Sequence, residues 1–229
     1  MEKKYFAPSE LIINSDGSVF HLHLKPKDLA EKVILVGDPG RVALVASHFE
    51  DIECEVSNRE FRAITGSYHR KRITVVSTGI GCDNIDIVLN ELDALANIDF
   101  QTRYENEQLR QLSLVRIGTC GGLQPNTPVG TYIASAKSIG FDGLLNFYAG
   151  RNQASDLDFE REFKEQVQWD MQMGNPYVSC ADSELLDRIA GDDMVRGVTI
   201  ACGGFFWSAG SRIALTTARS NVKYEDSEV

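Results

Sequence analysis

The chain has 229 residues, of which 43% are hydrophobic and 24% are charged, and this balance is typical of one globular domain rather than of a disordered chain. A net charge of −10 argues against a nucleic-acid partner, because proteins that bind the phosphate backbone concentrate Lys and Arg on one face. The five cysteines are scattered without a C-x-x-C pair, and no 18 apolar residues follow one another, so we expect reduced thiols, a cytoplasmic protein and no membrane partner.

The first predicted elements are a strand, a tight turn and a helix. Residues 33–36 form a short apolar run that is rich in β-branched side chains. Gly37-Asp38-Pro39-Gly40 follows this run, and residues 41–49 are compatible with a helix. A hairpin comes next, with strands predicted at residues 60–65 and 72–77 around a turn at Gly66-Ser67.

A second strand, glycine turn and helix follow the hairpin. The segment Thr78-Gly79-Ile80-Gly81 leads into a helix with Asp83 as its predicted N-cap. The apolar stripe of this helix consists of Ile85, Val88, Leu89, Leu92 and Leu95. The polar residues 99–112 lack an apolar period and are interpreted as a surface insertion or loose loop.

The remaining sequence repeats the alternation of strands and helices. A buried strand is predicted at residues 114–117, directly before Gly118-Thr119-Cys120-Gly121-Gly122. Further strands are predicted at residues 131–136 and 197–202, and helices at residues 159–173 and 183–190. This alternation predicts an α/β fold, a single domain over residues 1–229 whose mixed, mostly parallel central sheet is flanked by helices and binds ligands at the carboxyl ends of its strands.

Three junctions between a strand and a loop suggest the chemistry: Val36–Arg41, Ser77–Gly81 and Arg116–Gly121. Glycine lets a backbone N–H approach an anion closely, and arginine offers a planar fork of donors that suits phosphate. Together the junctions predict a phosphate cradle. For one junction alone an ordinary tight turn is the more common explanation, and for Arg116, within an apolar strand, a structural ion pair is the alternative to an anion.

These junctions resemble those of the nucleoside phosphorylase family, which includes uridine phosphorylase and the hexameric purine nucleoside phosphorylases. The matching stretches stand in the family's order, between about residues 18 and 206, at residues 19–22, 37–42, 58–61, 77–81, 116–121 and 197–199. His21-Leu22 and Arg59-Glu60-Phe61 look closest to the uridine phosphorylase branch. The resemblance implies a nucleoside phosphorylase-like fold and phosphate-dependent cleavage of a nucleoside, with uridine favoured, to free base and ribose 1-phosphate in nucleoside salvage.

The resemblance also implies roles for individual residues. The implied phosphate ligands are Gly37, Arg41, Arg59, Arg116 and Thr119, and the implied nucleoside ligands are His21, Thr119, Cys120, Gly121 and Phe205. Arg116 and Thr119 are the residues assigned to catalysis. Arg59 and His21 would reach across from a neighbouring subunit, so the expected partners are a nucleoside, phosphate and further copies of the chain in a homodimer or a trimer of dimers. The reaction needs no metal and no organic cofactor, since inorganic phosphate is the co-substrate.

Simpler interpretations exist for several of these residues. His21 and His23 could form a metal pair, but no acidic or cysteine partner is near them in the sequence, so ordinary histidines are favoured. Asp38 could be a catalytic acid, although an Asp-Pro-Gly segment more often forms a turn. Phe205 is equally compatible with a place in the core.

The resemblance ends near residue 206. The family expects Gly-Pro-Gln-Gly-Arg, which holds the base, and later a Met-Glu pair, whereas this chain has Trp207-Ser208-Ala209-Gly210-Ser211 and a divergent tail over 207–229, so the fold is expected to be truncated at its C-terminus. The codons GGT CCG CAG GGT CGC, with one preceding T, regroup to encode these five residues. We therefore hypothesise a one-base slip, which translation of the neighbouring frame of the gene would test.

This departure leaves two alternatives to an active phosphorylase. One is a catalytically silent or truncated homologue that binds phosphate, and the other is a nucleosidase that uses water. Arg41, Arg59 and Arg116 favour phosphate over water.

Overall fold

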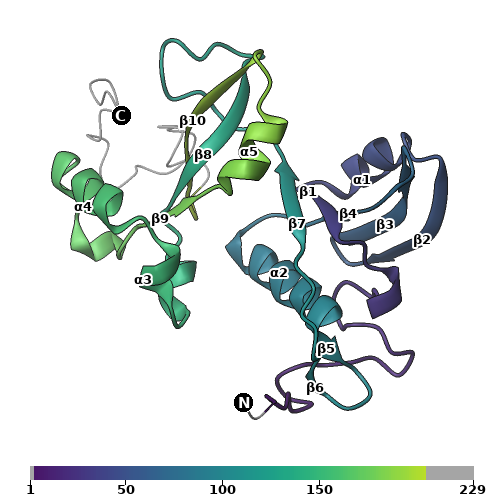
Figure 1. Cartoon of the computed structure of the whole chain (residues 1–229). Coiled ribbons are helices and arrows are strands. Elements are labelled where there is room, and N and C mark those ends of the chain that lie inside the picture. Colours follow the sequence, from purple (N-terminus) through teal and green to yellow (C-terminus); the bar gives the residue numbers. More distant parts are fainter. Residues whose placement is uncertain (1–2, 205–229) are drawn as a thin grey trace. The chain divides into compact units, whose positions relative to one another are not determined.

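The computed structural model describes residues 3–204, which form two compact units: a first unit up to Thr119 and a second unit from Cys120. Each unit has a main sheet of its own, and both are drawn in Figure 1. No helix within the described residues is long and apolar enough to cross a membrane.

The main sheet of the first unit has five strands in the order β2-β3-β4-β1-β7. The strands are β1 (Lys32–Val36), β2 (Asp51–Asn58), β3 (Phe61–Tyr68), β4 (Lys71–Ser77) and β7 (Ser113–Ile117). β1 pairs in parallel with β4 on one side and with β7 on the other. β2, β3 and β4 are joined as antiparallel neighbours, so the sheet is mixed.

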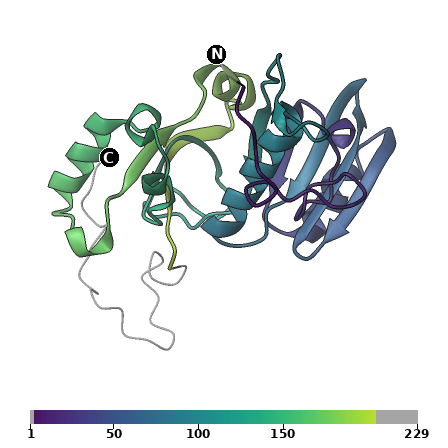
Figure 2. The ribbon, with the colours of Figure 1, turned by 90° about the horizontal axis from the view of Figure 1, so that it is seen from below.

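Helices α1 (Pro39–Ala46) and α2 (Cys82–Asn97) cover opposite faces of this sheet, because side chains alternate along its strands. Val33 and Leu35 of β1 belong to the cluster that contains α2. Val36 and its neighbour Ile34 pack instead with α1. The two helices and the strands between them can be followed in Figures 1 and 2.

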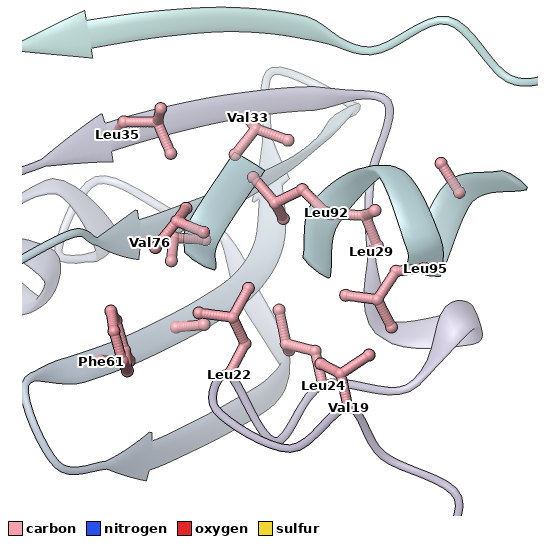
Figure 3. Packing of buried hydrophobic residues seen from close by; sticks show 13 residues of the cluster. Val19, Leu22, Leu24, Leu29, Val33, Leu35, Phe61, Val76, Leu92 and Leu95 are labelled. Carbon is pink, nitrogen blue, oxygen red and sulfur yellow. The ribbon is translucent and has the colours of Figure 1, made fainter. Parts of the chain in front are cut away.

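The larger core lies between α2, the sheet and the N-terminal segment. Leu92 and Leu95 of α2 pack in one cluster with Val33, Val76 and Leu22, as Figure 3 shows. The predicted apolar stripe is confirmed at Val88, Leu92 and Leu95, which are almost fully buried. It is wrong at Leu89, whose side chain is exposed, and the N-cap is Gly81 rather than Asp83.

The hairpin is present, but its predicted turn is wrong. β3 runs straight through Gly66 and Ser67, and the turn lies at His69 and Arg70, which both adopt positive φ values of 47° and 61°. Position 66 of the strand is a glycine because a Cβ there would overlap the backbone carbonyl of Asp51 and lie 2.7 Å from Cδ2 of Phe49. Its glycine therefore serves a close approach of β2 to β3.

Residues 98–112 are more ordered than predicted. β5 (Ile98–Asp99) pairs with β6 (Tyr104–Glu105) as a short antiparallel hairpin. The guanidinium of Arg103 donates to the carbonyl of Leu11 at 2.9 Å, which ties the hairpin to the N-terminal segment. That segment also contains the 3-10 turn η1 (Pro26–Asp28).

The second unit contains a three-stranded sheet in the order β10-β8-β9. β8 (Tyr132–Gly140) pairs in parallel with β10 (Met194–Ala201) and antiparallel with β9 (Tyr177–Cys180), a strand that we did not predict. The helical segments are η2 (Leu144–Phe147), α3 (Arg151–Ala154), α4 (Leu157–Gln166), η3 (Met171–Met173) and α5 (Ser183–Ile189). Ile139, Phe163 and Val178 form the centre of its core.

Helix α4 ends seven residues before the predicted end at residue 173. Gln168 adopts a positive φ of 50°, and the N–H of Trp169 donates to the carbonyl of Lys164 at 2.9 Å. A residue in the left-handed region closes the helix, so the apolar period beyond Gln166 belongs to a turn and to η3.

The predicted α/β class, with a mixed sheet flanked by helices, is confirmed. Parallel pairing accounts for three strand pairs in the described residues and antiparallel pairing for four, so the sheets are less parallel than predicted. The reason is that the β2-β3-β4 meander and the hairpins pair locally. The assignment of the whole chain to a single domain stays a prediction.

Candidate functional site

Three parallel strands of the first unit end at the same level of the sheet. Val36, the last residue of β1, is paired with Ser77 of β4 on one side and with Ile117 of β7 on the other. The loops that begin at Gly37, Thr78 and Gly118 therefore leave the sheet at one edge. This confirms the prediction that the glycine turns gather at the carboxyl ends of the strands, where α/β sheets bind ligands.

The guanidinium of Arg116 lies against two of these loops. A Cβ built on Gly37 would stand 3.9 Å from Nη2 of Arg116 and 3.8 Å from the carbonyl oxygen of Gly79. A Cβ built on Gly118 would stand 2.5 Å from Nη1 of Arg116. A side chain at position 118 would therefore move the guanidinium away from this place. Gly37, Gly79 and Arg116, far apart in the sequence, are brought together as predicted.

Backbone hydrogen bonds hold the loop ends in place. The N–H of Thr78 donates to the carbonyl of Val36 at 2.7 Å, and the buried hydroxyl of Thr78 lies 3.3 Å from the same oxygen. Gly79 and Gly81 have positive φ values of 66° and 97°, which side chains rarely adopt. The amide of Asn84 closes this turn by donating to the carbonyl of Ile80 at 3.0 Å.

Asp38 caps helix α1. Its carboxylate accepts a hydrogen bond from the N–H of Gly40 at 2.8 Å, and its own backbone is extended, as at an N-cap. This is the turn role that we favoured over a catalytic acid. The cap places Arg41 in the first turn of α1, beside the loop that starts at Gly37.

The predicted arginines differ from most others in lacking an acceptor. Eight of the arginines in residues 3–204 pair with a carboxylate or donate to a backbone carbonyl: Arg62, Arg72, Arg103, Arg110, Arg151, Arg161, Arg188 and Arg196. Within the same residues no ion pair or side-chain hydrogen bond is formed by Arg41, Arg59, Arg70 or Arg116. Three of these four guanidinium groups are the predicted phosphate ligands, and their donors remain available to an anion.

The expected burial of Arg116 is wrong, because its side chain is exposed at the end of the edge strand β7. The cost of burying a charge is therefore not what argues for an anion at this position. The geometry argues for it instead, since the guanidinium lies over Gly37 and Gly118 without an ion-pair partner among the described residues.

A second group contains His21 and Arg59. Arg59 occupies the turn between β2 and β3 with φ 55°, and its Cζ lies 5.8 Å from the centre of the Phe20 ring. The Phe20 and His21 rings meet edge to face at 4.9 Å. The amide of Asn58 donates to the carbonyl of His21 at 2.9 Å. The two residues assigned to a neighbouring site thus share one cluster.

His21 is fixed by a residue that sequence analysis missed. Its Nδ1 lies 2.7 Å from Oε1 of Glu91, a buried carboxylate on α2. The spacing could have revealed Glu91, because an acidic residue three positions after Val88 falls on the apolar face of the helix. Across residues 3–204, no group of three or more His, Cys, Asp or Glu side chains is placed to hold a metal ion.

The structure does not bring the remaining predicted ligands together with the loops at the strand ends or with the cluster of His21 and Arg59. Thr119 is the last residue of the first unit, and Cys120 and Gly121 begin the second unit, all three being exposed. Phe205 lies outside the described residues, as does the tail over 207–229. The structure thus brings Gly37 and Arg116 together, whereas the phosphate and nucleoside roles of all the named residues stay predictions.

Comparison with known proteins gives a consistent result. The family model described as "Phosphorylase superfamily" matches residues 31–226. A uridine phosphorylase from Treponema pallidum (strain Nichols) is 33% identical over 138 residues, which are 60% of this chain and 48% of the relative. A DeoD-type purine nucleoside phosphorylase from Alkaliphilus metalliredigens (strain QYMF) is 38% identical over 127 residues, covering 55% of this chain and 48% of the relative. The chain spans about half the length of these curated relatives.

Solved structures show the same fold. The crystal structure of a Trypanosoma brucei nucleoside phosphorylase that shows uridine phosphorylase activity superposes with a TM-score of 0.77 at 29% identity, over 89% of this chain and 72% of that chain. A uridine phosphorylase from the oomycete Phytophthora capsici superposes with a TM-score of 0.63 at 20% identity, over 95% of this chain and 74% of that chain. At this lower identity the likeness concerns the fold alone.

Proposed function

Since the chain belongs to the phosphorylase superfamily, we propose that it is a nucleoside phosphorylase, a pentosyltransferase that cleaves a nucleoside with inorganic phosphate. The favoured substrate is uridine, and the products are free base and ribose 1-phosphate for nucleoside salvage. Relatives named uridine phosphorylase and purine nucleoside phosphorylase support the reaction class. The sequences around His21 and Arg59, which look closest to the uridine phosphorylase branch, support uridine as the substrate within this reaction class.

The observation that carries this proposal is the convergence at the strand ends. Val36, Ser77 and Ile117 lie in one row of the sheet, and the loops after them bring glycine backbone and the Arg116 guanidinium together. Backbone N–H groups and guanidinium donors are the groups that bind phosphate oxygens. Arg41, in the first turn of α1 next to Gly37, adds a second unpaired guanidinium.

In the proposed reaction, a phosphate oxygen forms a bond to the anomeric carbon of the sugar while the bond from that carbon to the base breaks. The base leaves with the electron pair of that bond and takes up a proton. The sugar carries oxocarbenium-like positive charge in between, so a phosphate dianion held beside it both attacks and stabilises it. The protein contributes by holding phosphate and sugar in place and by balancing the charge. Thr119 would contact both phosphate and ribose, and no metal or organic cofactor takes part.

The proposed site is shared between two subunits. Arg59 would add a guanidinium to the neighbour's phosphate, and His21 would reach the ribose 5′-hydroxyl there. Their common cluster supports this, because the Phe20 ring contacts both the Arg59 guanidinium and the His21 ring. The base would lie near Cys120, Gly121 and Phe205.

The test is release of base by the chain as given. Uridine, thymidine and inosine are each incubated with the protein, with and without inorganic phosphate, and the free base and the pentose 1-phosphate are assayed, which is 2-deoxyribose 1-phosphate for thymidine. Because the chain lacks the Gly-Pro-Gln-Gly-Arg segment that holds the base, we expect phosphorolysis to be very weak, to depend on phosphate and to be fastest with uridine. Release that does not depend on phosphate would instead identify a nucleosidase, and absence of release from all three would contradict the proposed activity.

A further inference from the structure

His21 is attached to the protein through Glu91, and we propose that Glu91 is a positioning residue that sets the tautomer of the His21 ring. In this arrangement Nδ1 carries the proton, and Nε2 is left as an acceptor for a substrate hydroxyl. That the hydroxyl belongs to a nucleoside rests on the proposed function. The tautomer itself follows from the contacts within the first unit.

The carboxylate of Glu91 accepts several hydrogen bonds from one short segment. Its Oε1 lies 2.7 Å from Nδ1 of His21 and 3.0 Å from the backbone nitrogen of the same residue. Its Oε2 accepts from the backbone N–H of Leu22 at 2.8 Å and lies 3.1 Å from that of His21. An ionised carboxylate can only accept, so the hydrogen between Glu91 and the ring belongs to Nδ1.

Burial keeps this carboxylate in place. Glu91 lies on the face of α2 that also carries Val88 and Leu92, and Leu22 is one of the fully buried side chains of the same core (Figure 3). The segment of His21 and Leu22 thus contacts α2 in two ways. The Leu22 side chain packs in the same core, and the backbone N–H groups of both residues donate to Glu91. A buried carboxylate with satisfied oxygens has little freedom to reorient.

The ring itself is held on two further sides. Phe20 meets it edge to face at 4.9 Å, and Phe61 does so at 6.2 Å. The His21 side chain keeps 26% of its surface exposed. Nε2 has no hydrogen-bond partner within the described part of the chain. One ring nitrogen is therefore committed to Glu91 and the other is open to a ligand.

The tautomer can be read directly by 15N NMR of histidine-labelled protein, which has only four histidines. At alkaline pH we expect His21 to show a protonated Nδ1 and an unprotonated Nε2. His23 and His48, which are exposed, serve as internal references and should show the Nε2–H form usual in water. A His21 spectrum with protonated Nε2, like that of the references, would overturn the proposal. This readout requires no enzyme activity.

Glu91→Gln tests the cause. The Nδ1–H of His21 and the N–H of Leu22 donate to different oxygens of Glu91, and glutamine has an acceptor at only one of these two positions, so the Nδ1–H preference of His21 should be lost. Glu160→Gln is the matched control, because Glu160 is the other buried glutamate among the described residues and lies in the second unit. An unchanged His21 tautomer in Glu91→Gln contradicts the proposal. If this variant does not fold, the wild-type spectrum alone decides.

Kinetics distinguishes positioning from a general loss of structure. For Glu91→Gln we expect KM for uridine to rise about tenfold, the worth of one hydrogen bond. KM for 5′-deoxyuridine, which lacks the hydroxyl, should stay within about twofold because that contact does not exist. An equal rise for both substrates would overturn the positioning role. A wild-type chain without phosphorolysis would contradict the proposed function, while the NMR result would still decide the tautomer.

Discussion

The place of the Arg116 guanidinium depends on the missing side chain of Gly118, because a Cβ there would stand only 2.5 Å from Nη1 of Arg116. Nη2 of the same guanidinium approaches Gly37 across the sheet edge, at 3.9 Å from the position of a Cβ on that residue. This local arrangement explains why the glycines and the arginine form one motif.

Replacing Arg116 with Ala should weaken phosphate binding by about 1.5 to 3 kcal/mol, the usual worth of a hydrogen bond to a charged group, or roughly 10- to 150-fold. Isothermal titration calorimetry with inorganic phosphate measures this directly. Arg70→Gly is the matched control, because Arg70 is also unpaired in the described residues but lies in the β3–β4 turn with a positive φ that glycine tolerates. Unchanged affinity in Arg116→Ala would contradict the assignment.

At this scale the sequence revealed arginines and glycines but missed Glu91 and Thr78. A glycine turn or an arginine alone has ordinary structural roles, but three junctions of this kind are informative as a set. The helical spacing of Glu91 could have revealed its place on the apolar face of α2, but not that its partner is the segment around His21. Its partner is 70 positions away, and no local rule links the two. The burial of Arg116 was mispredicted because an apolar neighbourhood in the sequence did not reveal that β7 is an edge strand.

Among the elements, the β2-β3-β4 meander depends on a glycine inside a strand. Gly66→Ala should lower the free energy of unfolding by about 1 to 3 kcal/mol, the cost of overpacking, because the new methyl group would meet Phe49 and the backbone of Asp51. Chemical denaturation measures the change.

Gly197→Ala in β10 is the control for Gly66→Ala. Its Cβ would meet only Cγ2 of Ile133, at an ordinary 3.9 Å, so the same substitution within a strand should have a small effect. If both variants lose the same free energy of unfolding, the close approach of β2 is not the reason for the effect of Gly66→Ala.

The stability of the second unit should fall in acid because Asp156, the N-cap residue of helix α4, becomes protonated. Asp156 caps α4 by accepting from the N–H of Phe159, and it accepts from Nζ of Lys137 at 2.7 Å. The hydrogen bond from Lys137 holds the pKa of Asp156 below its ordinary value of 3.8, with a further contribution from the N–H of Phe159. A carboxyl group with a lowered folded pKa stabilises the fold above the unfolded value, and this stabilisation is lost as the pH falls through the folded pKa.

Asp156→Asn should therefore reduce the dependence of unfolding on pH between about pH 5 and pH 2, because asparagine keeps the cap but cannot titrate. Thermal unfolding across this range measures it. Asp158→Asn, which removes an exposed carboxylate that pairs with Arg161, is the control. A profile for Asp156→Asn that runs parallel to the wild type would refute the contribution of Asp156.

Elements were predictable where an apolar period was long and uninterrupted. β1 and α2 follow such patterns, whereas β8 was predicted only as far as Ala136 and continues to Gly140. β2 was missed although residues 51–56 alternate acidic and apolar side chains, which is the period of a half-buried strand. The turn was placed at Gly66-Ser67 because glycine usually marks a turn, but here the close approach of another strand determines the residue. His69 and Arg70 carry no turn signal, although both adopt positive φ.

At the scale of the whole molecule, the proposed site requires a second copy of the chain. We expect light scattering at working concentration to show at least a homodimer. A stable monomer would contradict the assignment of His21 and Arg59 to a neighbour's site.

Mixing two inactive variants provides a sharper test of sharing. Arg116→Ala damages a subunit's own cradle, and Arg59→Ala damages the neighbour's, so an exchanged heterodimer retains one intact site. Random mixing should restore about a quarter of the wild-type activity. Mixing Arg116→Ala with Arg41→Ala is the control, because both residues belong to one subunit's half and no intact site results. Equal recovery in both mixtures would argue against sharing.

The row formed by Val36, Ser77 and Ile117 also bears on how the protein folds. Ser77 follows Val36 by 41 positions and Ile117 by 81, so the cradle exists only after two long stretches of chain have closed on β1. Such non-local closure is slow, and no local segment can bind the anion before it. Phosphate bound at this edge would recognise a late, nearly native arrangement, so it should slow unfolding far more than it speeds refolding.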